Sequence, residues 1–278
     1  VFEVARVGLG ALGILTTITF KVEPLFLLEA HEQPMDWSRL VGEYDELAAD
    51  CHHMDVFWFP HTDRAMVKQN RRLAADVSEA EPPSRLAAWW EDEFISNTVL
   101  GVMCKLTNRA PSTIPRFNQV AGRALSERRY SDIAHRVFTS PRRVVFREME
   151  YAVPREAGIE VLKECRKALD ASDWKINFPV EIRNAPADDI PLSTANEQDS
   201  FYLAFHTHGD ADHTAYFSGI ESILKAHGGR PHWGKLHTRD AEELREVYPR
   251  FEQFLAMRDR LDPDRVFTNA YLERVLGA

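Results

Sequence analysis

Late in the chain, two histidines and an Asp-His pair lie within eight residues and could ligate a metal: His206, His208, Asp212 and His213. Histidines two apart on a strand share one face, and imidazole and carboxylate are common zinc ligands. A metal-dependent hydrolase is therefore one hypothesis. The spacing departs from the H-x-H-x-D-H pattern of metallo-hydrolases, because two extra residues precede the last pair. The simpler interpretation is a polar strand end that leads into a helix cap, and it predicts no metal.

Glu181 and Arg183 form a second candidate pair, inside a run typical of a β-strand at residues 178–184. Side chains two apart on a strand project from the same face. One interpretation is an ordinary surface ion pair. The other is a polar pocket in which Arg183 holds substrate oxygens and Glu181 accepts a hydrogen bond from a substrate hydroxyl. The pattern alone leaves both open.

A third candidate is the loop at residues 230–235, which combines His232, Trp233, Gly234 and Lys235. Loops with cationic and aromatic side chains often bind ligands. The alternative is a Trp233 ring packed against the core, with its charged neighbours in water.

Glycines at positions 8, 10 and 13 match the G-x-G-x-x-G pattern of dinucleotide-binding proteins. That fingerprint follows a strand and opens a helix, whereas here a predicted strand, residues 14–22, comes after the glycines. We therefore expect a tight turn in which bare backbone passes a cofactor or another strand.

The elements that must position these side chains alternate along the chain. Apolar periodicity and Pro or Gly punctuation predict strands at residues 14–22, 56–59, 143–153, 178–184 and 201–206. Helices are predicted at residues 36–49, up to about 108 after an exposed loop at 75–84, around 159–169, at 214–226 and at 241–261 with a restart at Pro249. This order predicts an α+β fold with a largely antiparallel sheet flanked by helices.

Composition narrows the classes of function. Apolar residues make up 44% of the 278 positions, enough for a substantial core, and the net charge of −9 disfavours nucleic acid as a partner. The most hydrophobic stretch, residues 86–105, carries three acidic residues near its middle, so we expect no transmembrane segment. Three widely spaced cysteines favour a reducing compartment. A buried-type strand so near the first residue, Val1, indicates the back half of a longer protein.

Several segments together resemble one family, the FAD-linked aldonolactone oxidoreductases, which include L-gulono-1,4-lactone and D-arabinono-1,4-lactone oxidases and dehydrogenases. The similar segments lie at residues 7–19, 57–63, 146–154, 179–183, 232–235 and 261–272. They stand in the family's order and correspond to its C-terminal half. The resemblance implies a flavoprotein of the vanillyl-alcohol-oxidase type with FAD as cofactor.

The resemblance also implies a division of the chain. Residues 1–24 would be the tail of the FAD-binding domain, residues 25–235 the substrate domain, and residues 236–278 helices that return to the FAD domain. The implied activity oxidises a sugar 1,4-lactone by hydride transfer from a secondary alcohol carbon to flavin N5. The implied partners are the lactone, the upstream FAD-binding domain and an electron acceptor, dioxygen or a cytochrome. We expect the protein in the cytoplasm, with peripheral membrane association as the alternative.

Residue roles follow from the same resemblance. Glu181 and Arg183 match an E-x-R motif that contacts substrate hydroxyls near the flavin, and Lys235 matches a lysine beside the flavin ring. These three are the expected catalytic residues, and Thr207 is a further expected substrate contact.

The expected cofactor contacts lie at two places in the chain. The resemblance places the backbone of Gly10, Gly13 and Ile14 along FAD. It places His232, from the same H-W-G-K motif as Lys235, next to the cofactor.

Overall fold

The computed structural model describes residues 1–209 and 211–277. Its centre is an eight-stranded sheet with the order β4-β1-β3-β2-β6-β7-β5-β8, in which each pair of neighbouring strands is antiparallel. The strands are β1 Leu27–Asp36, β2 His53–Trp58, β3 Arg64–Leu73, β4 Arg128–Ile133, β5 Phe146–Pro154, β6 Val180–Ala185, β7 Ser200–His208 and β8 Arg230–Pro231. The predicted α+β class with a largely antiparallel sheet is confirmed.

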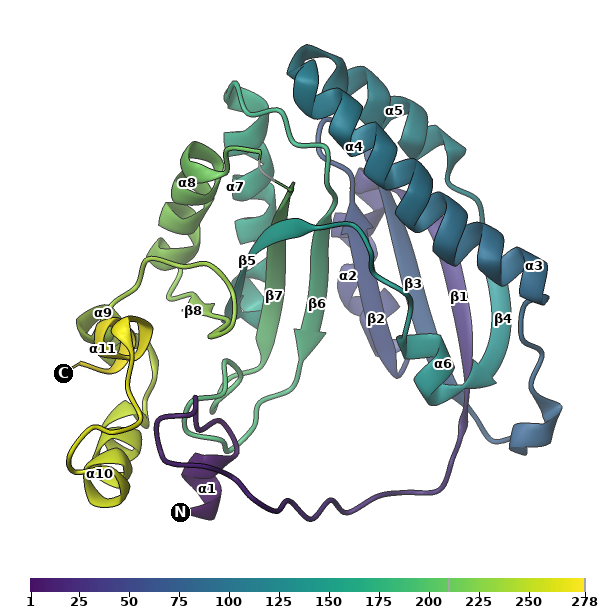
Figure 1. Ribbon diagram of the computed structural model, residues 1–278. Coiled ribbons are helices and arrows are strands. Elements are labelled where there is room, and N and C mark those ends of the chain that lie inside the picture. Colours follow the sequence, from purple (N-terminus) through teal and green to yellow (C-terminus); the bar gives the residue numbers. More distant parts are fainter. Residues whose placement is uncertain (210, 278) are drawn as a thin grey trace.

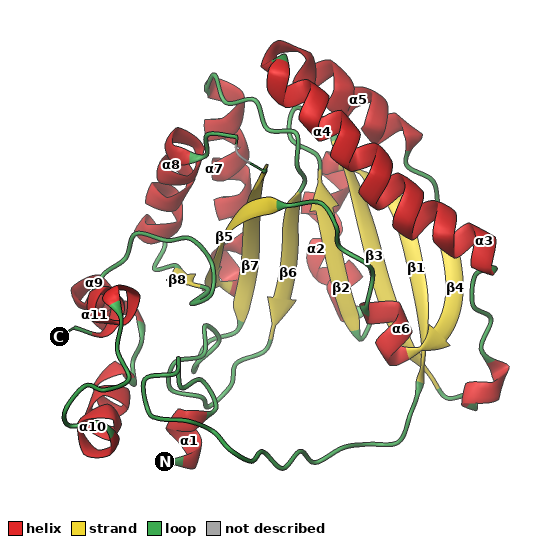
Figure 2. Cartoon of the chain, viewed as in Figure 1, coloured by secondary structure: helices red, strands yellow, loops and turns green. Residues whose placement is uncertain are grey.

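Helices cover both sides of this sheet (Figures 1 and 2). Behind it lie α2 (Trp37–Ala49), α7 (Gly158–Ala171) and α8 (Thr214–Ala226). Across the other side run α4 (Leu100–Arg109) and α5 (Ile114–Ala124), with the π-helix η2 (Trp89–Val99) leading into α4. The remaining helices are α1 Phe2–Ala5, α3 Arg85–Ala88, α6 Ala134–Phe138, α9 Ala241–Val247, α10 Phe251–Leu261 and α11 Ala270–Leu276.

Strand alternation gives β6 and β7 two different faces. Val180 and Ile182 of β6, and Leu203 and Phe205 of β7, are buried in the main core with α2, α7 and α8. The residues between them, such as Glu181, point to the opposite face. The apolar face anchors the sheet, and the other face of the same strands can carry charged side chains.

A second core joins the two ends of the chain. Val4 and Ala11 pack with Leu244, Phe254 and Val275 from the C-terminal helices. Residues 1–12 and the helices after residue 240 therefore form one packed unit beside the sheet. The predicted boundaries at residues 24 and 235 stay predictions.

The predicted strand at residues 14–22 is wrong. The segment belongs to none of the sheet's strands. Ile14 is 79% exposed. The other exposed apolar side chains in and just after this segment are those of Leu15, Ile18, Phe20, Val22 and Leu25. A strand needs a neighbour for its backbone hydrogen bonds, and the described part of this chain provides none for this β-prone segment.

Strands β1, β3 and β4 and helices α5 and α11 were not predicted from the sequence. Strand β3 reads RAMVKQNRRL, with few apolar residues, and β1 includes a proline. Several of their side chains are charged instead and form ion pairs across the sheet, such as Arg71 with Glu29. Helix α5 begins beside two prolines that the sequence analysis took for a broken connection.

The close contact between α7 and β7 gives a stability prediction. A Cβ added at Gly158 would lie 2.3 Å from the Phe201 ring, where the structure has no room. Gly158→Ala should therefore lower the free energy of unfolding by roughly 1 to 3 kcal/mol, the usual cost of overpacking. Gly42→Ala, also in a helix but with nothing within 4 Å, should stabilise by about 0.5 to 1 kcal/mol. Equal denaturant midpoints for both variants would contradict this packing.

Candidate active site

Six ionisable side chains meet on the face of β5, β6 and β7 that points away from α7 and α8. We call them the charged cluster: Glu148, Glu150, Glu181, Arg183, His206 and Lys235. Register explains why they meet. Glu148 lies opposite His206 on β7, and both Glu150 and Glu181 lie opposite Ala204, one from each side.

Glu150 connects the two permanent cations of the charged cluster. Its Oε2 atom accepts hydrogen bonds from Arg183 at 2.6 Å and from Lys235 Nζ at 2.9 Å. Lys235 also donates to Glu148. Arg183 Nε lies 3.6 Å from Glu181 Oε1. The structure therefore brings together the three predicted catalytic residues, Glu181, Arg183 and Lys235.

Backbone hydrogen bonds fix the loop that carries Lys235. The amide of His232 donates to the carbonyl of Glu150 at 2.9 Å, and the amide of Leu236 donates to that of Glu148 at the same distance. The loop thus continues the edge of the sheet along β5. This pairing places the ammonium group over the two glutamates.

The charged cluster lies in a largely dry environment. Glu150 and Glu181 are buried, and the side chains of Glu148 and Lys235 are mostly covered. Burial alone would raise the pKa of Glu148, but hydrogen bonds and charge from His206 and Lys235 outweigh it and lower that pKa to about 2. Burial would lower the pKa of Arg183, and the carboxylates of Glu181 and Glu150 raise it overall. Both groups are charged near neutral pH.

Glu148 should make folding sensitive to acid. Its pKa is lower in the folded state, about 2, than its ordinary value of 4.5. Its contribution to stability is therefore fully present above about pH 4.5 and is lost as the pH falls toward about 2. Between about pH 5 and pH 2.5 the wild type should lose roughly 2 kcal/mol more unfolding free energy than Glu148→Gln. Urea titrations across this range measure the difference. Parallel pH dependences for wild type and Glu148→Gln, with the exposed Glu156→Gln as control, would contradict the ion pairing.

Two other predicted site residues lie apart from the charged cluster. Thr207 follows His206, so alternation turns it to the face of Phe205, where its hydroxyl has no hydrogen-bond partner among the described residues. The structure separates Thr207 from the residues it was expected to join. His232 is exposed, and its Nδ1 accepts from the Gly234 amide at 3.1 Å.

The Trp233 ring packs against the second core. Its indole nitrogen donates to the Leu192 carbonyl at 2.7 Å, and its ring lies 5.1 Å from that of Tyr248. The interpretation that this tryptophan is a packed residue is confirmed.

The glycine turn near the N-terminus requires glycine for its backbone. Gly10 and Gly13 have φ values of +71° and +123°, in the region that disfavours side chains. A Cβ at either position would meet no atom of the described residues within 4 Å. Ala11 between them packs into the second core, and Ile14 after them is exposed. The backbone of this turn is thus open on one side, and its predicted contact with FAD stays a prediction.

The residues of the hydrolase hypothesis do not form one site. His206 belongs to the charged cluster, and His208 hydrogen-bonds with α4. Asp212 accepts from the first backbone amide of α8, and His213 packs on an aromatic ring of that helix. Among the described residues, the group spaced to hold a metal is Glu148, Glu181 and His206. There the Lys235 ammonium already supplies a cation, so nothing supports the hydrolase.

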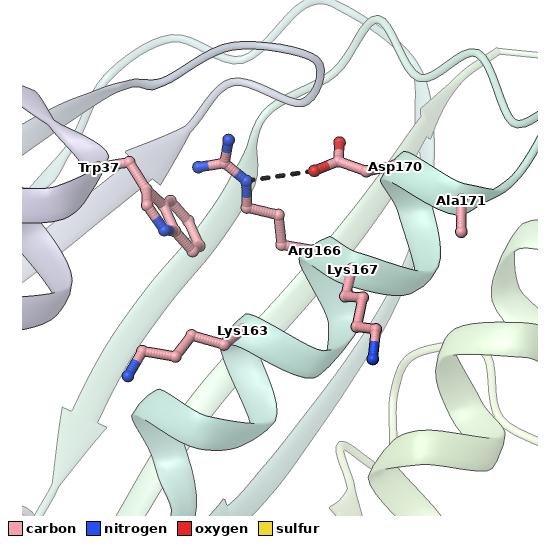
Figure 3. Close-up of a pocket in the computed structure, with 6 residues that line it drawn as sticks. All are labelled: Trp37, Lys163, Arg166, Lys167, Asp170 and Ala171. Carbon is pink, nitrogen blue, oxygen red and sulfur yellow. Dashed lines mark hydrogen bonds and ion pairs between the residues drawn. The ribbon is translucent and has the colours of Figure 1, made fainter.

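The described part of the chain has hollows away from the charged cluster. One, of about 450 Å³, lies on the far side of the sheet between α2 and α7 and is lined by Trp37, Lys163, Arg166, Lys167, Asp170 and Ala171 (Figure 3). There Arg166 stacks 4.4 Å from the Trp37 ring centre and pairs with Asp170 at 3.4 Å. The other, a groove of about 1240 Å³, reaches His208 at the end of β7. Neither is lined by a residue of the charged cluster.

Sequence reasoning missed Glu148, Glu150 and His206 as members of the site. A signal for the glutamates was present, because they alternate in a predicted strand, residues 143–153, that was otherwise apolar at its end. Two like charges on one strand face indicate a cationic partner. His206 was predicted either as a metal ligand or as a polar residue at a strand end.

Comparison with known proteins decides the family. Residues 18–275 match the family model described as D-arabinono-1,4-lactone oxidase. The chain belongs to the D-arabinono-1,4-lactone oxidase family. It is 39% identical over 275 residues to the L-gulono-1,4-lactone dehydrogenase of Mycobacterium tuberculosis, covering 98% of this chain and 63% of that protein. It is 31% identical to the L-gulonolactone oxidase of Bos taurus, with 99% and 63% covered. The resemblance seen in the sequence is confirmed.

Solved structures of other proteins have a similar fold. Cholesterol oxidase from Brevibacterium sterolicum is similar with a TM-score of 0.69 at 15% identity, covering 91% of this chain and 60% of that one. The VAO-type flavoprotein MtVAO615 of Myceliophthora thermophila is similar with a TM-score of 0.52 at 12% identity, covering 88% and 47%. The chain spans less than two thirds of the length of these curated relatives and structures. Among the described residues, no helix has the length and apolar character of a membrane span.

Proposed function

We propose that the charged cluster is the substrate site of an FAD-dependent oxidoreductase that oxidises a sugar 1,4-lactone, L-gulono-1,4-lactone or a similar aldonolactone. The names of the two relatives support the substrate class. The observation that carries the proposal is that Lys235, Arg183 and Glu181 meet on one face of the sheet, where Glu150 bonds to both cations and Arg183 lies 3.6 Å from Glu181. Such a group can bind a polyhydroxylated substrate and stabilise charge on it.

The residues of this face fit a flavin cofactor. Lys235 and Arg183 are cations, and the reduced flavin ring carries negative charge. Gly10 and Gly13 leave room for a backbone to lie against a ligand without a Cβ in the way. When bound, FAD supplies the acceptor for the hydride that leaves the substrate carbon.

The side chains of this chain would divide the remaining work. The partly exposed guanidinium of Arg183 binds substrate oxygens by paired hydrogen bonds. Glu181 accepts a hydrogen bond from the reacting hydroxyl and takes its proton. Lys235, held by Glu148 and Glu150, stabilises the negative charge that develops in a largely dry site. Glu150 keeps both cations in place.

An FAD-binding region of the same protein is the proposed partner of residues 14–25. Their exposed apolar side chains and extended backbone suit pairing with a further sheet. Curated relatives have additional length that such a region would occupy. The proposed electron acceptor is dioxygen or a cytochrome. A cytoplasmic location is part of this proposal and agrees with the free thiols of Cys51, Cys104 and Cys165.

Spectroscopy of the full-length protein tests the proposal. We expect flavin absorbance near about 370 and 450 nm, and anaerobic L-gulono-1,4-lactone should bleach the longer-wavelength band. D-arabinono-1,4-lactone tests the breadth of the substrate class. Cholesterol, the substrate named for a protein of the same fold, serves as the control and should leave the band unchanged. A protein without flavin, or a flavin that neither lactone reduces, would contradict the proposal.

A further inference from the structure

His206 lies at the centre of the charged cluster with a hydrogen-bond acceptor at each ring nitrogen. Its Nδ1 is 2.9 Å from the carbonyl oxygen of Pro179. Its Nε2 is 3.2 Å from Glu148 Oε1. The residue is only 4% exposed, so water cannot replace either partner.

These two contacts limit the protonation of the ring. A carbonyl oxygen and an ionised carboxylate only accept hydrogen bonds, so each nitrogen must carry a hydrogen to be satisfied. A neutral imidazole has one N–H and one lone pair, and its lone pair would face an acceptor. The doubly protonated imidazolium satisfies both contacts. The Lys235 ammonium, which donates to the same Glu148 oxygen, keeps that carboxylate ionised.

The charge of the cluster leads to the same assignment. The charged cluster holds three carboxyl groups, Glu148, Glu150 and Glu181, and two permanent cations, Arg183 and Lys235, and the Asp55 carboxyl group also interacts with Arg183. An excess of negative charge in a buried cluster is costly, and one more proton would reduce it. Imidazole is a stronger base than a carboxylate, so that proton resides on the ring.

We propose that His206 is a buried imidazolium and acts as a positioning residue, which holds Glu148 and, through it, Lys235. The charged groups around it come from three elements: Glu148 from β5, Glu181 from β6, and, from the loop after β8, Lys235, which shares Glu148 Oε1 with the ring. Ligand atoms of Glu148, Glu181 and His206 lie within 4.8 Å of one another.

Two aromatic rings shield this proton from solvent. The rings of Phe146 and Phe178 have their centres 5.2 and 5.5 Å from that of His206. Because these apolar rings exclude water, the neighbouring carboxylates are the groups that determine the charge of the His206 ring.

The charge state can be observed without any turnover. In the full-length protein labelled with ¹⁵N-histidine, a long-range ¹H–¹⁵N spectrum at about pH 7.5 separates imidazolium from neutral tautomers, because only the neutral ring has an unprotonated nitrogen. His206→Gln identifies the resonance, and the exposed His232 provides a reference. We expect both nitrogens of His206 to be protonated. A neutral tautomer would overturn the proposal.

A second variant tests the cause and does not require His206→Gln to fold. Glu148→Gln removes the carboxylate partner, so one buried histidine should change from the imidazolium spectrum to that of a neutral ring at the same pH. Glu156→Gln, which is exposed, should leave the spectrum unchanged. No change in any histidine of Glu148→Gln would overturn the proposal.

The kinetic consequence of this charge rests on the proposed function. In His206→Gln, kcat should fall roughly 10- to 100-fold through misplacement of Lys235, and an alkaline limb of the wild-type pH profile should disappear. An unchanged profile would contradict the positioning role. The two NMR measurements still decide the charge of His206 if the protein oxidises no lactone, so the two failures are distinguishable.

Discussion

Replacing Lys235 by alanine should slow lactone oxidation roughly 100- to 1000-fold at saturating substrate, the range for removal of one preorganised electrostatic donor. The reason is the position of its ammonium group, which Glu148 and Glu150 hold in a mostly covered site. A cation fixed in that way stabilises charge in the transition state without reorganisation. Steady-state kcat in the full-length protein measures the loss.

The matched control is Lys167→Ala on the outer face of α7. Lys167 is exposed and lies on the other side of the sheet from the charged cluster. It should retain wild-type kcat. Equal rates in the two variants would show that Lys235 only supports the structure of its loop.

Glu181→Gln should lower kcat/KM roughly 100- to 10,000-fold, the usual range for loss of a general base. Glutamine keeps the size of the side chain and a hydrogen-bonding oxygen, but it cannot take the proton of the reacting hydroxyl. The acidic limb of the kcat/KM profile should therefore disappear along with the rate. Flavin content should stay unchanged, because Glu181 contacts the substrate.

A Glu→Gln change elsewhere separates this effect from a general loss of charge. Glu156 is exposed in the short 3₁₀ turn that precedes α7, and Glu156→Gln should keep both the rate and the acidic limb. A Glu181→Gln enzyme with the wild-type pH profile would mean that Glu181 and Arg183 form only a structural ion pair.

Much of the site could be predicted because strand alternation is a local property. Glu181 and Arg183 lie two apart, so any strand through them places both on one face. The H-W-G-K motif gave Lys235 through its resemblance to the family. Helices such as α2 and α8 were predictable from apolar periodicity, which depends only on neighbouring turns.

The partners of these residues depend on which strands lie side by side. Glu150 can join Arg183 to Lys235 only because β5 and β6 flank β7, and β5 lies far from β6 in the sequence. The sequence predicted Thr207 as a substrate contact, but the structure places its neighbour His206 in the charged cluster. A shift of one residue along a strand moves a side chain to the other face, and the resemblance to the family in this segment did not determine the register.

The segment 14–22 shows the opposite case, in which local preference is not sufficient. Its β-branched residues favour a strand, but backbone pairing requires a neighbour, and no described strand lies beside it. Whether these residues form a strand therefore depends on tertiary contacts, which the sequence of the segment alone does not encode.

Anaerobic stopped-flow reduction of the flavin by L-gulono-1,4-lactone tests the central claim most directly, because it isolates the step that the charged cluster should assist. Wild type, Lys167→Ala and Glu156→Gln should share one fast rate of bleaching. Lys235→Ala and Glu181→Gln should bind flavin but reduce it at least roughly 100-fold more slowly. Wild-type reduction rates in both of these variants would show that the lactone is oxidised at another place in the protein.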